Sequence, residues 1–348
     1  MVMWSMFKIF NGVLMEYKRE KGETNIIIPD NVKVIGSDAF CCCRTIKSVE
    51  LPDSVTKIEP QAFKNCTNLE HIILSEQITS IDDEAFYACV NLDKIEFPSM
   101  LSYIGSRAFY GCKYLERIRF PECLTEIGDE SFKVCINLEE IEFGNSIQKI
   151  GRQAFANTSW LERKRKENPL VIVNNILIDA YKCKNILSIP DNVAAISEGA
   201  FEKNTKISEL LLKSDQYEKS IKINNSSEIE SIFRLINSSK NIQEILLQQI
   251  EDEELKIHIA MFLAFGKGNF VGEKYLSDNI IKTVKSLIQS NDIENMKNIL
   301  KGNYITDSNI DELVGYSIEH ERFEIQTLLL EHKNETIGFQ NVHDRFKL

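Results

Sequence analysis

Cysteines are the residues whose type and spacing first suggest chemistry in this 348-residue chain. Three stand in a row, Cys41, Cys42 and Cys43, in the stretch DAFCCCRTI, and the whole sequence holds nine. Thiolates bind zinc when their spacing lets several converge on one point, as two paired C-x2-C motifs do. The sequence contains no such pairs. The choice among a metal site, a redox site and a structural role therefore depends on the surroundings of each cysteine.

Cys43 belongs to a column of cysteines that repeats every 23 residues. The other members are Cys66, Cys89, Cys112 and Cys135. A line with one thiol per repeat does not converge on an ion, and a small apolar thiol suits a tightly packed column. We therefore interpret the column as structural and expect no metal. Cys41 falls outside the column and is expected to be exposed, either as a reactive thiol or, on the favoured interpretation, as an inert one.

Motifs that carry catalysis are missing from the sequence. It has no G-x-S-x-G, no H-E-x-x-H and no identifiable histidine partner for a cysteine. The segment GKGNFVGEK (266–274) departs from the phosphate-loop pattern, because Gly272 is followed by Glu273, and we interpret it as a turn between helices. We expect no catalytic residue, no cofactor and no enzymatic activity.

Composition and charge exclude several classes of partner. The formal net charge is −11, with 43% hydrophobic and 27% charged residues. An acidic chain is not expected to bind nucleic acid or an anionic membrane. The first residues, MVMWSMFKIFNG, do not resemble a secretion signal, and no apolar run is long enough to span a membrane. We expect a cytoplasmic protein with reduced thiols, with surface exposure only through an unrecognised export route.

Phenylalanine marks the period of the chain most clearly. The members of its column are Phe40, Phe63, Phe86, Phe109, Phe132, Phe155 and, two periods on, Phe201. Ile35 begins a parallel column five residues earlier, and Ala39 begins another immediately before the phenylalanines. One such repeat cannot cover its own apolar face, so the columns predict stacked turns that share a continuous core.

Each repeat contains a short segment of alternating apolar and polar residues, such as LDKIEFP and LERIRFP, which predicts a strand. The outward positions of these strands form the candidate protein-binding face. Its residues are His71, Ile73, Lys94, Glu96, Arg117, Arg119, Glu140 and Glu142. Lys94 and Arg117 are like charges on neighbouring strands, and an acidic partner would relieve their repulsion. The alternative is a surface that merely keeps the protein soluble.

These columns together resemble the BspA-type (treponemal) leucine-rich repeat, whose unit reads here as C-x2-L-x2-I-x-L/F-x3-V/I-x2-I-x3-A/S-F-x2. The resemblance covers residues 24–212. It implies a curved solenoid with a concave strand sheet, and recognition of other proteins in place of catalysis. The fold class that we expect is an α+β repeat protein, a solenoid of 23-residue repeats followed by an all-α domain.

Two segments interrupt or precede the repeats. FKIFNGVLMEYK (7–18) and PLVIVNNILIDAYK (169–182) each place two alternating runs around a tight turn, which predicts hairpins. The run ERKRKE (162–167) is interpreted as a solvated loop in preference to a nucleic-acid or localisation motif. The expected domains are a hairpin cap over 1–23, the repeats over 24–212 with a hairpin insertion near 169–182, a linker over 213–228 and a helical domain over 229–348.

The last third of the chain has helical spacing of its apolar residues, beginning at Ile229, Ile232 and Phe233, with Ser226 or Ser227 as the expected N-cap. Segments 287–300 and 317–330 align with an offset of 30 residues. This pair resembles a degenerate ankyrin repeat, and an unrelated helical bundle is the alternative.

From these features we expect a non-catalytic scaffold that binds an unidentified protein partner through the concave strand face. A bacterial cell-surface adhesin is a second possibility, suggested by exported members of the family. An enzyme with an unrecognised site in the helical half is the third.

Overall fold

A computed structural model describes residues 6–18, 22–202 and 204–336 of the chain, which divides into two compact units. Unit 1 lies within residues 1–184 and 189–206, and unit 2 within residues 185–188 and 207–348. The predicted fold class is confirmed, since unit 1 is a solenoid of repeats spaced by 23 residues and a helical region follows it.

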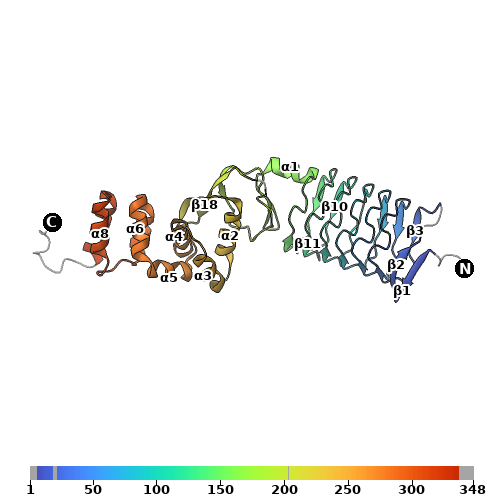
Figure 1. The fold of residues 1–348 in the computed structure, drawn as a ribbon, viewed down its shortest axis with the longest axis horizontal. Helices are drawn as coiled ribbons and strands as arrows, with labels where there is room; N and C mark the ends of the chain where they lie inside the picture. The colour runs from blue at the N-terminus through green and yellow to red at the C-terminus, as the bar shows by residue number, and fades with distance from the viewer. Residues whose placement is uncertain (1–5, 19–21, 203, 337–348) are drawn as a thin grey trace, which may run out of the picture. The chain divides into compact units, whose positions relative to one another are not determined.

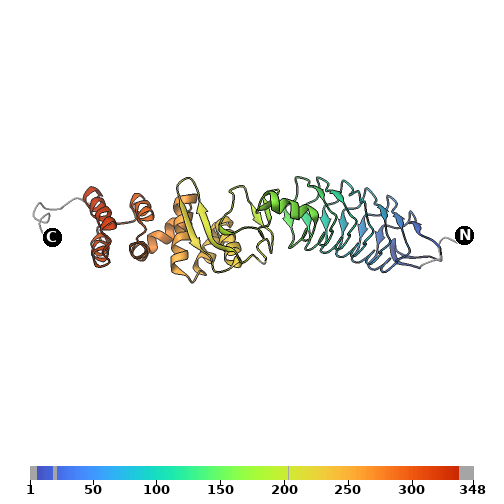
Figure 2. The ribbon, with the colours of Figure 1, turned by 90° about the horizontal axis from the view of Figure 1, so that it is seen from above.

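Unit 1 is a stack of turns whose strands form separate ladders, parallel from one turn to the next and antiparallel within hairpins (Figures 1 and 2). One ladder joins the strands β1 (Phe7–Phe10), β2 (Val13–Tyr17), β4 (Val34–Ile35), β6 (Lys57–Ile58), β8 (Ser80–Ile81), β9 (Tyr103–Ile104), β11 (Glu126–Ile127) and β13 (Lys149–Ile150). A second contains β3 (Asn25–Ile27), β5 (Ser48–Glu50) and β7 (His71–Ile73), and a third contains β10 (Arg117–Arg119) and β12 (Glu140–Glu142). Figure 1 shows β3 and β10 on one side of the stack and β2 and β11 on the other.

The phenylalanine column forms the centre of the core. The rings of Phe40, Phe63 and Phe86 are fully buried, and successive ring centroids lie 4.9 and 5.1 Å apart in stacked orientation. The same stacking continues to Phe132 and, at 5.7 Å, to Phe155. Offset stacking adds to the large apolar area that each ring buries, so the column ties every turn to its neighbours.

The third side of each turn is held by backbone hydrogen bonds instead of a β-ladder. The N–H groups of Phe40, Phe63 and Phe86 each donate to the alanine carbonyl one turn on, at 2.7 Å. Two residues per turn adopt positive φ around these donors, for example Asp38 at 58° and Cys42 at 61°. Left-handed backbone costs energy for residues other than glycine, and the inter-turn hydrogen bonds offset that cost.

The cysteine column packs beside the phenylalanines as a line of buried hydrogen-bond donors. The thiols of Cys66, Cys89 and Cys135 each lie 3.1 Å from the carbonyl oxygen of a phenylalanine in the preceding turn. Cys112 makes the same bond at 3.3 Å. Each thiol therefore fills a small space in the core and satisfies part of a buried carbonyl.

The predicted strand near Lys94 is reduced to a single bridge between His71 and Lys94. Among the described residues, no hydrogen-bonded ladder joins segment 94–97 to β10. The break coincides with a change from Leu74 to Phe97 at the inward position. The Phe97 ring packs edge-on against Phe109 at 5.6 Å.

Hairpins form at both positions where the sequence indicates them. β1 and β2 pair antiparallel, as do β14 (Val171–Val173) and β15 (Ile176–Asp179). β2 continues into the main ladder through β4, and β15 pairs with β17 (Ala195–Ile196). The ring of Tyr17 stacks on Phe40 at 5.0 Å, so the first hairpin covers the end of the aromatic column.

The basic run ERKRKE was expected to be a loop, and this expectation is wrong, because the run lies in helix α1 (Ser159–Glu167). The hydroxyl of Thr158 caps the helix by accepting from the N–H of Leu161 at 3.1 Å. Trp160 and Leu161 are buried, and the Trp160 ring packs on Phe155 at 5.4 Å. Two apolar side chains and a cap thus anchor a helix whose remaining residues are charged.

Unit 2 begins with a sheet, which corrects the expected linker over 213–228. β18 (Ile207–Lys213) pairs in parallel with β16 (Asn185–Ser188) and antiparallel with β19 (Glu218–Lys222). Ile221 of β19 is buried, although its neighbours in sequence are polar. A single inward apolar residue, together with backbone pairing, is sufficient for a strand at the edge of this sheet.

Helices make up the rest of unit 2. They are α2 (Ser226–Asn237), α3 (Lys240–Gln248), α4 (Glu253–Met261) with a π-helical turn at Phe262–Gly266, α5 (Phe270–Asp278), α6 (Ile280–Ser290), α7 (Ile293–Lys301), α8 (Ile310–Glu319) and α9 (Phe323–Thr336). The N-cap of α2 is Asn225, in place of the expected serines, because its side chain accepts from the N–H groups of Ser227 and Glu228. The GKGNFVGEK segment contains the turn before α5, as predicted, and Asn269 caps that helix.

The 30-residue offset found in the sequence corresponds to two helix pairs, α6–α7 and α8–α9. Asn291 and Glu321, 30 residues apart, have φ values of 54° and 57° in the turns that join each pair. The N–H groups of Asp292 and Arg322 then donate to helix carbonyls five residues back, each at 2.9 Å. The two turns share one geometry, so the pairs are structural repeats of each other; whether they are ankyrin-like stays a prediction.

Candidate protein interface

The candidate face consists of two parallel rows of outward side chains, here called the strand face. Register between strands places Ser48 beside His71 and Glu50 beside Ile73. Farther along, Arg117 pairs with Glu140 and Arg119 with Glu142. The bridge from His71 to Lys94 extends the first part by one repeat, and a hollow lined by both segments lies between Lys94 and the second part. The structure therefore brings the eight sequence-derived residues together on one surface in the expected order.

Ion pairs on the strand face relieve the repulsion that the sequence suggested between Lys94 and Arg117. The Lys94 ammonium lies 2.6 Å from the Glu96 carboxylate, while Arg117 lies 3.8 Å from Glu140. Because Lys94 and Glu96 hydrogen-bond to each other, the pKa of the lysine is raised and that of the glutamate is lowered. These side chains are mostly exposed, so the pairs contribute little to stability and leave the charges accessible.

A hollow of about 860 Å³ opens where the strand ladder is interrupted. Segment 93–97 forms one wall, and Glu116–Arg119, Glu140 and Glu142 form the rest. Its charged lining consists of three cations and five carboxylates: Lys94, Arg117, Arg119, Asp93, Glu96, Glu116, Glu140 and Glu142. The surplus of two negative charges means that the hollow is acidic, which the sequence analysis did not anticipate.

Ile27 is a member of the strand face that the sequence analysis omitted. It stands one period before Glu50, so the 23-residue spacing alone could have found it. Its side chain is 68% exposed, and that of Ile73, in the same row, is 60% exposed. The strand face thus has exposed aliphatic side chains toward its first repeats and charged side chains toward its last.

The three consecutive cysteines divide into different environments. Cys43 is buried with its column, and Cys42 is exposed. Cys41 was expected to be exposed, but it is half-buried, with its sulfur 3.6 Å from that of Cys42. Burial, followed by the Cys42 contact, raises the pKa of Cys41 to about 12, which disfavours the reactive thiolate. Among the described residues, no group of three or more metal-ligating side chains is assembled.

A hollow of about 780 Å³ within the helical half lies over α4, α6 and α8. Glu253 in this hollow lies 2.8 Å from Lys282 and 3.3 Å from Lys256, and these partners lower its pKa. A carboxylate held ionised in this way is poorly suited to donate a proton. No helix of the described residues has the length and apolar character needed to cross a bilayer.

Comparison with known families agrees with the repeat geometry. The family described as BspA type leucine-rich repeat region matches residues 17–135 and 102–229, with six copies. The chain belongs to this family. The BspA-type repeats therefore cover most of the chain, from β2 to the first turn of α2.

Solved structures similar to this chain are also leucine-rich-repeat proteins. A T. pallidum protein is 24% identical over 47% of this chain and 94% of its own, with a TM-score of 0.40. A cell surface protein of Faecalibacterium prausnitzii is 25% identical over 57% of this chain and 49% of its own, with a TM-score of 0.42. This chain thus spans about half of the second protein, and neither likeness carries a functional argument at these TM-scores. No curated protein matches the chain.

Proposed function

We propose that this BspA-type repeat protein is a non-catalytic scaffold that binds a protein partner through the strand face. The observation that carries the proposal is the interrupted ladder, which combines a hollow of about 860 Å³ with largely exposed rows of charged side chains on the stack of turns. Repeat proteins of this kind present such surfaces for recognition. Family and fold are typical of non-catalytic proteins, in keeping with this reading.

Charge indicates what kind of surface the partner presents. The hollow has two more carboxylates than cations, and the whole chain has a net charge of −11. A partner with basic side chains would be attracted at long range and would find Glu140 and Glu142 near Arg117 and Arg119 for local pairing. This replaces the acidic partner suggested by the sequence, because Lys94 and Arg117 already have carboxylate neighbours. The exposed Ile27 and Ile73 supply apolar contact area beside the charges.

The experiment that tests the proposal is capture of partners from the native host, followed by binding kinetics of purified partner and variants. Glu140→Lys with Glu142→Lys should slow association at least tenfold at low salt, and added salt should reduce the difference. Lys94→Glu with Arg117→Glu should leave association equal or faster. The matched control is Asp30→Lys with Asp53→Lys, an identical change of charge at exposed turns outside the strand face.

Three outcomes separate the alternatives. If the control pair slows association as much as Glu140→Lys with Glu142→Lys, general charge and not the strand face governs binding. If a captured partner associates with all three variants as fast as with the wild type, it binds elsewhere, and the helical half is the next candidate. A surface adhesin, the second reading, would be found in the cell-envelope fraction of the native host.

A further inference from the structure

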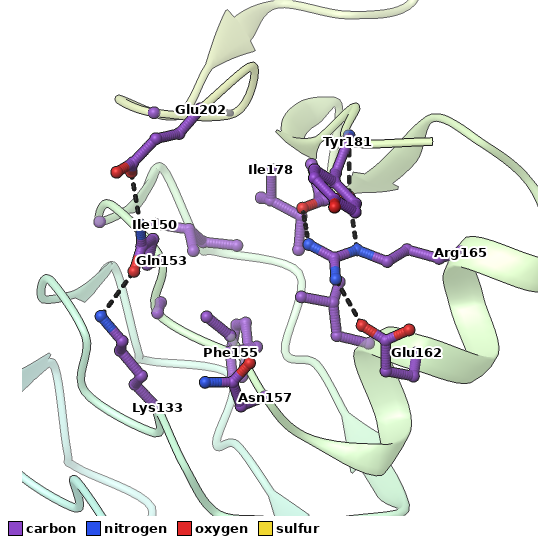
Figure 3. Close-up of a pocket in the computed structure, with 16 residues that line it drawn as sticks. Lys133, Ile150, Gln153, Phe155, Asn157, Glu162, Arg165, Ile178, Tyr181 and Glu202 are labelled. Carbon is purple, nitrogen blue, oxygen red and sulfur yellow. Dashed lines mark hydrogen bonds and ion pairs between the residues drawn. The ribbon is translucent and has the colours of Figure 1, made fainter. Parts of the chain in front are cut away.

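A second pocket lies within unit 1, where the regular stack of turns ends. Its volume is about 350 Å³, and it lies between the turn 153–157 with Glu202 on one side and α1 with the β15 end of the second hairpin on the other (Figure 3). Its apolar lining includes Phe155, Leu161 and Ile178. The pocket is remote in sequence from the strand face, and none of the eight candidate residues of that face lines it.

Backbone donors that are paired in every preceding turn are left open here. The N–H groups of Glu84, Phe86 and Ala88 donate to carbonyls of the next turn, at 2.9, 2.7 and 2.7 Å. The equivalent groups at the end of the regular stack belong to Gln153, Phe155 and Asn157, each three periods on. Among the described residues, none accepts a hydrogen bond from these three N–H groups.

The pocket is lined by these same residues and by residues of the hairpin that follows them, so it occupies the side from which the next carbonyls would come. An unpaired N–H beside a buried residue such as Phe155 costs free energy unless an acceptor reaches it.

The aromatic column is interrupted at the same place. Tyr17 of the first hairpin donates its N–H to Ala39, and its ring stacks on Phe40. Ala180 occupies the same place after the second hairpin, since its N–H donates to Ala200 at the same distance of 2.8 Å. A methyl group therefore stands where the first hairpin has a phenol. Among the described residues, no ring after Phe155 stacks on it, and the next phenylalanine of the column, Phe201, comes two periods later. Trp160 covers only the edge of the Phe155 ring, at an interplanar angle of 61°.

Polar side chains on both flanks of the pocket are mutually neutralised. On one side Gln153 bridges Lys133, at 2.6 Å, and Glu202 (Figure 3). On the other side Arg165 makes a two-point contact with Asp179 and a further bond to Glu162. With these charges already paired, the pocket favours a neutral ligand over an ion.

We propose that this pocket binds an aromatic residue in an extended segment of a partner protein. The ring lies over Phe155 against Ile178 and Leu161, and the carbonyl oxygens of the segment accept from the N–H groups of Phe155 and Asn157. The same two contacts recur at five junctions between regular turns of this chain. At each junction, a phenyl ring of one turn stacks on that of the preceding turn, and carbonyl groups accept hydrogen bonds from its N–H groups. A pocket of this volume suits one side chain and its adjoining backbone.

The test uses the full-length protein and a minimal ligand, N-acetyl-phenylalanine amide, followed by amide chemical shifts. We expect saturable shift changes centred on the amides of Gln153, Phe155 and Asn157. N-acetyl-alanine amide, which keeps the carbonyls and lacks the ring, should bind at least tenfold more weakly. Equal binding of the two compounds, or shifts that avoid this turn, would overturn the proposal.

A variant that closes the pocket provides the second arm. Ala156 lines the pocket and lies in the column that holds Tyr87 and Tyr110 in earlier turns, so the fold accepts a tyrosine at this position. Ala156→Tyr should weaken binding of N-acetyl-phenylalanine amide at least tenfold while the amide spectrum of the other turns is unchanged. Cys41→Tyr, in the same column and far along the chain, is the matched control and should bind as the wild type does. Unchanged binding of N-acetyl-phenylalanine amide to folded Ala156→Tyr protein would contradict the proposal that the pocket is its binding site. Neither result tests the proposed function of the strand face.

Discussion

The thiol of Cys66 donates a hydrogen bond to the carbonyl oxygen of Phe40, 3.1 Å away and one turn earlier. The same carbonyl also accepts the N–H of Cys43 at 3.0 Å. The cysteine and phenylalanine columns are therefore joined by hydrogen bonds as well as by packing. This arrangement explains a cysteine at the position without a metal or a disulfide, because a thiol is small, apolar and able to donate weakly.

Removal of one thiol should cost a modest amount of stability. Cys89→Ala deletes the bond to Phe63 and leaves a small space, but the Phe63 carbonyl keeps its backbone donor. We expect a loss of about 1–2 kcal/mol, from the net value of a hydrogen bond and a small cavity. Urea denaturation compared with wild type measures it. A loss above about 4 kcal/mol would mean that the thiol contributes more than one hydrogen bond and the filling of a small cavity.

Alkylation should distinguish the nine cysteines in the native protein. The exposed Cys42 and Cys123 should react with iodoacetamide at pH 8, and Cys41 should react slowly because its pKa is raised to about 12. The buried column should react only when the array unfolds. Mass spectrometry of labelled peptides reads out each site. Rapid labelling of Cys89 or Cys112 in folded protein would contradict the buried column.

Alkaline pH should destabilise the array through the same thiols. Burial raises the pKa of Cys135 to about 12 from an unfolded value of 9.0. The folded state then holds a proton that the unfolded state releases, so the contribution is complete below pH 9 and is lost as pH rises toward 12. Each such thiol adds a slope of up to about 1.4 kcal/mol per pH unit in this window.

Comparison with Cys135→Ser isolates that thiol from lysines and tyrosines that titrate in the same range. Denaturation midpoints at pH 8, 9, 10 and 11 would show a shallower decline for the variant. Parallel pH profiles for the two proteins would show that the Cys135 thiol does not contribute.

Damage to the aromatic column should stay local. Phe86 is fully buried between two stacked neighbours, and Phe86→Ala should cost about 3–5 kcal/mol. Because each turn contacts only its neighbours, hydrogen exchange should quicken most in the turns of Phe63 and Phe109. Amides of α6 to α9, in unit 2, serve as the internal control. Uniform loosening of both units would refute their independence.

Periodicity made the solenoid predictable, since the same residue types recur at one spacing and every turn has the same inward positions. The pattern could not show the missing strand at Lys94, because LDKIEFP alternates like its neighbours. The inward ring alone does not account for the break, because Phe97 packs edge-on against Phe109 as Phe120 does against Phe132, and the strand before Phe120 is paired. Helix α1 was also hidden, since its charged residues outnumber the two buried ones that anchor it.

The strand β19 and the pocket beside the turn 153–157 could not be predicted from the sequence for a different reason. Ile221 is the single buried residue within β19, so alternation gives no signal there and backbone pairing with β18 determines the structure. The pocket lies beside the N–H groups of Gln153, Phe155 and Asn157, which donate to no carbonyl of the described residues, and the sequence of that turn resembles the others. The eight strand-face residues, by contrast, followed directly from period and alternation.

The ion pair of Arg165 with Asp179 should contribute more than any exposed pair of the solenoid. Both side chains are largely buried, at 14% and 12% exposure, and the guanidinium makes two bonds to the carboxylate. Asp179→Ala leaves Arg165 with Glu162 as its remaining carboxylate partner. We therefore expect a loss of about 2–3 kcal/mol, below the range for a wholly unpaired buried charge.

The matched control is Glu126→Ala, which removes the carboxylate from the exposed partner Lys149 and should cost less than about 1 kcal/mol. Replacement of both buried partners, Arg165→Met with Asp179→Leu, should recover part of the loss, because it leaves no charge without a partner. Thermal and urea denaturation of the three variants supply the comparison. Equal losses for Asp179→Ala and Glu126→Ala would show that water reaches the Arg165 site as freely as the surface, and that α1 is held to the second hairpin by its apolar side chains alone.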